Sequence, residues 1–243
     1  MIDCSSPEAL LNKCIELERL GFSGCLITGG STPAGIIPWH RFFPVLREIK
    51  QRTSLQISVH SGLMNEETAK RFHETGVDRV LIDVVGSDET LETVHNLGCG
   101  ISSIENTLRH LSHYRIPFVP HIVIGIHKGK ILGEKRALEM IRKCNPSQLN
   151  LVVFMPLPET PLAKCPPPAL KEVADIMSTA RDMFIDITIA LGCGRPRGSY
   201  SIELERLALE MGFNKIALWN DETLAYAQEL GIEYNFKETC CCL

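Results

Sequence analysis

The phrase LERLGFSGCLIT at residues 17–28 returns in altered form as FHETGVDRVLID at residues 72–83 and as ALEMGFNKIALW at residues 208–219. Each copy joins a helix end to a short apolar run through one glycine, which is Gly21, Gly76 or Gly212. Glycine suits a helix end because it adopts left-handed backbone angles at little cost. The apolar runs lack alternation, which is typical of parallel strands covered on both faces. The phrase therefore predicts repeated helix–strand units of a parallel sheet.

Extending this pattern along the chain predicts seven strands with helical segments between them. The expected strands are residues 24–28, 55–60, 79–84, 118–125, 149–155, 186–191 and 215–219. The first helix is expected to begin at Ser6-Pro7, an N-cap serine followed by proline in the first turn. The regular alternation without a linker favours one (β/α) barrel of the TIM type, and a doubly wound sheet is the alternative.

The number of strands is one short of a complete eight-stranded barrel, and the chain opens on a helix. We therefore expect an open or incomplete barrel whose first strand is missing. The barrel domain is expected to span residues 1–235. Residues 236–243, FKETCCCL, form a cysteine-rich C-terminal tail.

The composition describes an ordinary globular protein with 44% hydrophobic residues, 22% charged residues and a formal net charge of −4. This balance predicts neither a nucleic-acid partner nor a membrane partner. No stretch is long and apolar enough to span a bilayer, and the start MIDCSSPE does not resemble a signal peptide, so the cytoplasm is the expected compartment. Ten cysteines are many for that compartment, and thiolate chemistry, metal ligation or burial must account for them.

Glycine-rich and polar segments follow several predicted strands, where (β/α) barrels place their active sites. Gly29, Gly30 and Ser31 follow the first strand, and Gly125 and Ile126 follow the fourth. Exposed backbone N–H groups at such glycines can hold a carboxylate or phosphate.

Ionisable side chains at the strand ends have both structural and functional interpretations. His60 and His121 lie on two strands, and each is either a histidine satisfied inside the barrel mouth or a proton-transfer residue. Asp83, if it points inward, is a carboxylate in an apolar wall, which favours a functional role. Arg195 is either part of a solvated turn or a clamp for an anion. Glu134 is explained as a charge at a helix start.

The strand-end segment Gly29-Gly30-Ser31, the block VPHIVIGIHKGKILGEKRAL from Val119 and the run LGCGRPRG from Leu191 resemble radical S-adenosylmethionine enzymes. The resemblance covers nearly the whole chain and is to the biotin-synthase-like branch, which includes archaeal-type two-subunit lipoyl synthases. It implies a barrel that binds S-adenosylmethionine and an iron–sulfur cluster. It also implies sulfur insertion or another functionalisation of a C–H bond, hence a transferase.

The resemblance implies roles for individual positions. The backbone of Gly29, Gly30 and Ser31 matches a segment that binds the methionine amino group, although serine stands where the family has glutamate. Gly125 and Ile126 match the strand that lines the adenine, and we expect His60, at the same mouth, to bind the cofactor as well. We expect His121, Asp83 and Arg195 to carry the catalytic chemistry; Arg195 matches the position of an arginine near a second cluster.

The chain departs from the family at the CxxxCxxC loop that holds the radical-generating four-iron cluster, because no such spacing occurs. That loop follows the first strand, so we expect one missing upstream segment to explain both absences. As written, the chain is not expected to cleave S-adenosylmethionine. Cys14 and Cys25 are expected to be ordinary buried residues. The predicted ligands of an auxiliary cluster are Cys193 and the tail cysteines, Cys240, Cys241 and Cys242.

The resemblance and the missing CxxxCxxC loop together leave two functions of different class. The first is a radical enzyme body that acts on a small molecule resembling a lipoyl or biotin precursor, with a possible partner subunit. The second is a cluster-free barrel that acts as a partner subunit or binds a small molecule. A cofactor-independent lyase that uses His121, Asp83 and Arg195 is a third, weaker interpretation.

Overall fold

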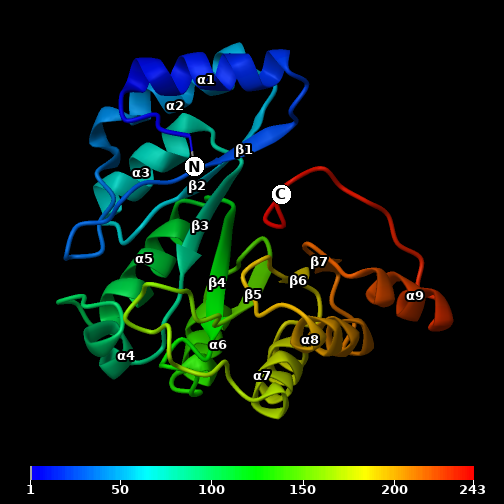
Figure 1. Ribbon diagram of the computed structural model, residues 1–243. Helices are drawn as coiled ribbons and strands as arrows, with labels where there is room; N and C mark the ends of the chain where they lie inside the picture. Colours follow the sequence, from blue (N-terminus) through cyan, green and yellow to red (C-terminus); the bar gives the residue numbers. More distant parts are fainter. Residues whose placement is uncertain (1) are drawn as a thin grey trace.

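The computed structural model describes residues 2–243, which form a curved, parallel, seven-stranded sheet (Figure 1). The strands follow the order of the sequence, so each pairs with the one before it. They are β1 (Gly24–Ile27), β2 (Gln56–His60), β3 (Arg79–Asp83), β4 (Phe118–Ile124), β5 (Leu149–Val153), β6 (Ile189–Leu191) and β7 (Lys215–Ile216). This order confirms an open (β/α) half-barrel and excludes the doubly wound alternative, whose strand order reverses.

Helices connect successive strands and cover the outer face of the sheet (Figure 1). They are α1 (Pro7–Arg19), α2 (Phe43–Arg52), α3 (Glu66–Thr75), α4 (Asp88–Thr93), α5 (Ile101–His113), α6 (Glu134–Arg142), α7 (Leu170–Met183), α8 (Ser199–Glu210) and α9 (Asp221–Glu229), with a short 3-10 helix at Trp39–Arg41. None of the helices among residues 2–243 is long and apolar enough to cross a membrane.

The local signals read from the sequence produce these elements. Ser6 caps α1 by accepting a hydrogen bond from the Ala9 N–H, and Pro7 occupies the first turn. The three predicted helix-end glycines have positive φ angles: 84° at Gly21, 72° at Gly76 and 68° at Gly212. A residue with a side chain would be strained at these angles, which explains why each helix ends where the repeated phrase predicts.

The two faces of the sheet differ in what they contact. Alternate strand residues, such as Ile57, Val80 and Leu149, join the hydrophobic core between the sheet and the helices. The residues between them face the concave side, where a second, small cluster contains Leu81 and Val119. β1 and β7 each pair with one strand only among the described residues, so the sheet does not close around this side.

A buried ion pair fixes the loop after β6 to α8. The side chains of Arg195 and Glu205 are fully buried, with 2.7 Å between Nη2 and Oε1. Arg195 also donates to Ser201 Oγ and to the carbonyl oxygens of Gly192 and Leu218. All three guanidinium nitrogens are thus engaged inside the protein. The ion pair between Arg195 and Glu205 is thus a structural brace that joins the loop after β6 to α8. Its surroundings give no support to the catalytic role predicted for Arg195.

Removing one partner of this pair should destabilise the fold, because the other charge would stay buried and unpaired. We expect Glu205→Ala to lower the free energy of unfolding by about 3–5 kcal/mol in urea denaturation. The matched control is Glu48→Ala, which removes the exposed 2.7 Å pair with Arg52 and should change stability by less than about 1 kcal/mol. Equal effects of the two substitutions would contradict the brace.

The brace should also make stability depend on pH. Burial alone would raise the pKa of Glu205, but hydrogen bonds from Thr223 and Arg195 outweigh it and hold the pKa below its usual value. The unfolded chain therefore binds this proton first as pH falls. The stabilisation should be complete above the ordinary glutamate range and lost as pH drops through the lower folded value. Acid unfolding followed by circular dichroism should show a shallower pH dependence for Glu205→Gln; identical profiles would contradict this.

Candidate active site in the half-barrel

The concave face of the sheet carries polar side chains from five strands. They are Ser58 and His60 on β2, Asp83 on β3, His121 on β4, Gln148 and Asn150 on or beside β5, and Lys215 on β7. Alternation along each strand directs them away from the helices. Four of them, Ser58, Gln148, Asn150 and Lys215, were not identified from the sequence. The alternation of polar and apolar residues in QLNL, residues 148–151, is the signal that marks Gln148 and Asn150.

The C-terminal tail crosses from α9 to the concave side of the sheet and ends there (Figure 1). Cys242 is 2% exposed and packs against Leu81 and Val119. Gln148 Nε2 donates to the carbonyl oxygen of Cys241 at 2.7 Å, and Lys215 Nζ donates to that of Leu243 at 2.8 Å. The tail thus fills the centre of the half-barrel.

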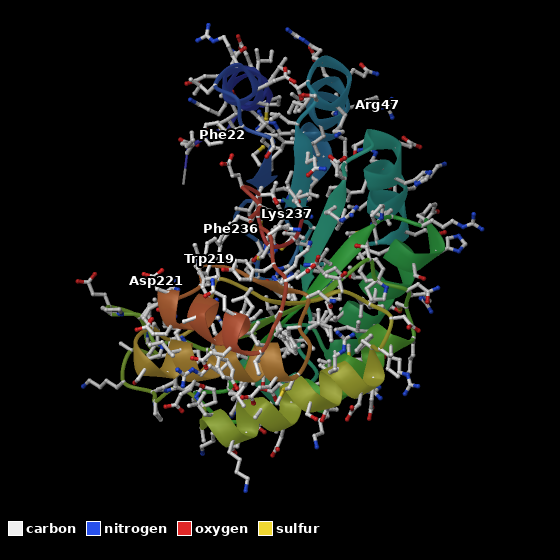
Figure 2. The ribbon with its side chains drawn as sticks, turned by 90° about the vertical axis from the view of Figure 1, so that its right-hand side faces the viewer. Phe22, Arg47, Trp219, Asp221, Phe236 and Lys237 are labelled. Carbon is white, nitrogen blue, oxygen red and sulfur yellow. The ribbon has the colours of Figure 1, made fainter. Side chains whose placement is uncertain are left out.

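Aromatic side chains fix the start of the tail. Phe236 packs against Trp219 with ring centroids 5.0 Å apart, and Tyr234 contacts Phe236 edge-on at 5.6 Å. Figure 2 shows Trp219 and Phe236 together, with Lys237 of the tail nearby. The tail is therefore anchored both before its cysteines and at them.

Three of the four cysteines predicted as metal ligands gather at this place, and the fourth, Cys193, lies in the exposed loop after β6. The sulfur atoms of Cys240, Cys241 and Cys242 all lie within 4.8 Å of one another. Cys193, at the end of β6, forms a hydrogen bond with Cys241 that lowers the pKa of Cys193 to about 6. The same contact raises the pKa of Cys241, while Cys241 lowers the pKa of Cys240. The contacts among these thiols thus lower the pKa of Cys193 and Cys240 and raise that of Cys241 and Cys242.

His121 connects this thiol cluster to the strand ends. Its Nε2 atom lies 3.2 Å from Cys242 Sγ, and its Nδ1 atom lies 3.1 Å from the carbonyl oxygen of Val119. Burial lowers the pKa of His121, although the negative charge of Asp83 opposes the shift. The ring of His60 lies 5.6 Å from that of His121, centroid to centroid. The structure thus brings together the two histidines that the sequence places on neighbouring strands of one mouth.

Asp83 lies on the same face as His121 and pairs with it in register across β3 and β4. Its side chain is exposed. The expectation of a carboxylate in an apolar wall is therefore wrong, because the half-barrel is open at this point. The exposed carboxylate needs no buried partner, and it lies where a ligand in the mouth can contact it.

The residues predicted to bind a cofactor occupy three separate strand ends, with His60 at the end of β2. Gly29, Gly30 and Ser31 form an exposed loop after β1, and a Cβ added at Gly30 would contact nothing within 4 Å. Gly125 and Ile126 follow β4. Gly125 has φ 78°, and a Cβ there would lie 2.6 Å from the ring of Pro168, so both strain and space require glycine.

An apolar cavity of about 480 Å³ lies at the carboxyl ends of β4 and β5. Its walls include Val123, Ile126, Val152, Phe154 and Gly194. Its volume is in the range of small-molecule sites, and it combines hydrophobic side chains with the backbone edges of two strand ends. Among the residues predicted to bind a cofactor, Ile126 therefore lines this cavity.

Glu134 organises the loop between β4 and α6, a role that the sequence analysis interpreted only as helix capping. The side chain is 4% exposed, and Oε1 accepts a 2.8 Å hydrogen bond from the Gly125 N–H. Burial raises the pKa of Glu134, and hydrogen bonds from backbone N–H groups oppose the shift. The sequence signal that could have indicated this contact is that Glu134 and Gly125 lie in the same glycine-rich block.

Loss of the Glu134 carboxylate should loosen the loop at residues 125–133. Glu134→Ala leaves the buried Gly125 N–H without its acceptor, which costs about 1–3 kcal/mol. Amide hydrogen exchange should therefore become faster in this loop, while Glu134→Gln, which keeps an acceptor oxygen, should stay close to the wild type. Equal exchange in all three proteins would show that Glu134 does not hold the loop.

Comparison with known proteins supplies an independent view of this architecture. The profile of the Radical SAM superfamily matches residues 5–144. A crystal structure of methylornithine synthase is similar with a TM-score of 0.60 and 23% identity, over 86% of this chain and 60% of that one. HydG, a maturase of the [FeFe]-hydrogenase, gives a TM-score of 0.65 at 14% identity, over 87% of this chain and 49% of that one.

Coproporphyrinogen III oxidase (HemN) from Escherichia coli, described as a radical SAM enzyme, gives a TM-score of 0.54 at 14% identity. The match covers 73% of this chain and 44% of that one. The chain thus spans between about two fifths and three fifths of the length of these three proteins. At these identities the likeness concerns the fold.

Proposed function

Because the chain belongs to the radical S-adenosylmethionine superfamily, we propose that its half-barrel binds S-adenosylmethionine and serves the functionalisation of a C–H bond in a small molecule. The observation that carries the proposal is the apolar cavity at the ends of β4 and β5. An adenosine group fits a cavity of this size, because its flat ring needs apolar walls and its ring edge needs backbone donors and acceptors. When bound, S-adenosylmethionine supplies the carbon radical that this family uses.

The chain's own residues have separate tasks in this proposal. Val123, Val152 and Ile126 line the apolar walls against which the adenine packs. The open backbone at Gly29 and Gly30 is available to the polar methionine end. Glu134 holds the adenine-side loop through Gly125. His60 and Asp83 present polar groups to the substrate in the mouth, whereas His121 is buried against Cys242 of the tail.

The cysteines of this chain do not fit the radical-generating cluster of the family. No CxxxCxxC spacing occurs in the 243 residues. The three cysteines whose sulfurs gather within 4.8 Å are in the tail, far along the chain from β1. We therefore assign no step to that cluster, and we propose that this chain alone does not cleave S-adenosylmethionine.

Sulfur insertion, as in biotin and lipoyl synthases, is a more specific version of the proposal. The contact between Cys193 and Cys241 supports it, because thiols lie inside the half-barrel, where a sulfur-supplying cluster must face its substrate. The short distances between the tail sulfurs, however, suit a single metal ion better than a cluster. We therefore propose the functionalisation of a C–H bond in general and do not specify sulfur insertion.

A barrel that binds a small molecule or serves as a partner subunit is the second candidate. The absence of the CxxxCxxC spacing favours it. The two candidates share the cavity and differ in whether a radical forms. Anaerobic reconstitution of this chain together with a segment that carries the CxxxCxxC loop separates them: formation of 5′-deoxyadenosine would overturn the binding-only function, and its absence would overturn the radical enzyme body.

A side chain that fills the cavity should abolish binding of the nucleoside part. Gly194 lines the cavity, and the nearest atom to an added Cβ, on Val152, lies 3.6 Å away, so a phenylalanine can enter without an immediate backbone clash. We expect Gly194→Phe to weaken S-adenosylmethionine binding at least about tenfold in calorimetry, a loss of about 1.4 kcal/mol.

The control is Leu20→Phe, at an exposed position beside α1, which should bind as the wild type does. No binding by the wild type would overturn the proposed function. Unchanged binding by a folded Gly194→Phe variant would show that the cavity is not the binding site.

A further inference from the structure

The tail cysteines form a preorganised group of soft ligands inside the protein. Their three sulfur atoms lie within 4.8 Å of one another, and those of Cys241 and Cys242 are 3.8 Å apart. The imidazole Nε2 of His121 lies 3.2 Å from Cys242 Sγ. Neighbouring elements hold this group in place, since the tail is fixed by Gln148 and Lys215.

These distances can be compared with the edges of a metal-centred tetrahedron. Zn–S bonds of about 2.3 Å and Zn–N bonds of about 2.0 Å that meet at the tetrahedral angle separate two sulfurs by about 3.8 Å, and a sulfur and a nitrogen by about 3.5 Å. Two of the six edges, 3.8 Å between Cys241 and Cys242 and 3.2 Å between Cys242 and His121, are close to these values. An ion would draw the His121 ring toward the other two sulfurs, because the group within 4.8 Å contains the three cysteines alone. Cysteines that bind an iron–sulfur cluster usually attach to different irons, which spreads their sulfurs wider than one tetrahedral edge.

We propose that Cys240, Cys241, Cys242 and His121 form a tetrahedral site for a single thiophilic divalent ion, with Zn²⁺ the best match. Three thiolates and one imidazole are a donor set of structural zinc sites, in which all four ligands come from the protein. The site goes beyond the proposed function and does not depend on S-adenosylmethionine.

The surroundings of the four ligands match those of a built metal site. His121 Nδ1 lies 3.1 Å from the Val119 carbonyl oxygen, so an N–H there fixes the ring and leaves Nε2 free to bind metal. Asn150 Nδ2 lies 3.5 Å from Cys241 Sγ and 3.6 Å from Cys242 Sγ, where it can donate to both. Leu81 and Val119 form an apolar floor beneath Cys242.

Cys193 has a different place from the four ligands. It is an exposed residue of the loop after β6. His121, in contrast, is fixed on β4 and touches Cys242 directly. We therefore assign the fourth position to His121, and Cys193 lies beside the site without binding the ion.

An ion at this site would fasten the tail to β4 across the open face of the half-barrel. The two attachments are 121 residues apart in the chain, between Cys242 and His121. A link between such distant residues closes a long loop, which restricts the unfolded chain more than a local link does. Binding should therefore raise the melting temperature.

Cobalt provides the direct probe, because Co²⁺ in a tetrahedral thiolate site absorbs strongly in the visible range. We expect reduced, metal-free wild-type protein to develop this absorption on titration with Co²⁺, to bind a single ion per chain and to lose the colour when Zn²⁺ displaces it. The variants Cys242→Ser and His121→Asn should lose the tetrahedral thiolate spectrum. Cys99→Ser and Cys193→Ser, controls outside the four ligands, should keep it.

A thermal melt makes the test independent of colour and of folding defects. Zn²⁺ should raise the melting temperature of the wild type and of Cys99→Ser, but not that of a folded Cys240/Cys241/Cys242→Ser triple variant. A colourless wild type that Zn²⁺ fails to stabilise would overturn the site. Loss of the spectrum in Cys193→Ser would overturn the assigned ligand set. A brown iron–sulfur cluster bound by the tail cysteines would overturn the single-ion assignment.

Discussion

The contact of Cys242 with the floor of the half-barrel is the interaction on which the rest of the site depends. An open parallel sheet exposes its inner face, whose central residues Leu81 and Val119 are apolar and need a cover. The tail supplies that cover and brings three thiols against His121 as it does so. The same contact of the tail therefore buries the apolar surface of the sheet and assembles the group of metal ligands.

This arrangement divides the half-barrel into two regions with different chemistry. The centre is filled by the tail and held by polar side chains from β5 and β7. The mouth remains open at the carboxyl ends of the strands, where the apolar cavity, Asp83 and the glycine loop after β1 lie. The described residues that line the cavity come from β4, β5 and neighbouring segments and not from the tail, so the cavity and the tail are separate regions of the half-barrel.

The fold could be predicted because its signals are local. Helix-end glycines such as Gly76 and the apolar runs after them specify each helix–strand unit, and all seven expected strands occur. Their ends were less predictable: β6 begins at Ile189 instead of residue 186, and β7 stops at Ile216 instead of residue 219. The apolar residues of the sequence extend beyond the residues that pair with a neighbouring strand. Composition alone therefore does not mark where a strand begins or ends.

The site was predictable only in part, because its contacts join residues far apart in the chain. The sequence identified the tail cysteines and Cys193 as a group, but nothing local indicated that Cys242 contacts His121. Arg195 shows the opposite case. An arginine between glycine and proline in a strand-end loop suggests anion binding, yet its partner Glu205 lies ten residues on, inside α8, and the pair is fully buried.

X-ray absorption at the zinc edge of the zinc-loaded protein tests directly whether the tail and His121 form a thiolate metal site inside the half-barrel. We expect a shell of three sulfurs at about 2.3 Å and one nitrogen at about 2.0 Å. A shell of oxygen and nitrogen alone, or one with no sulfur from the tail, would contradict it.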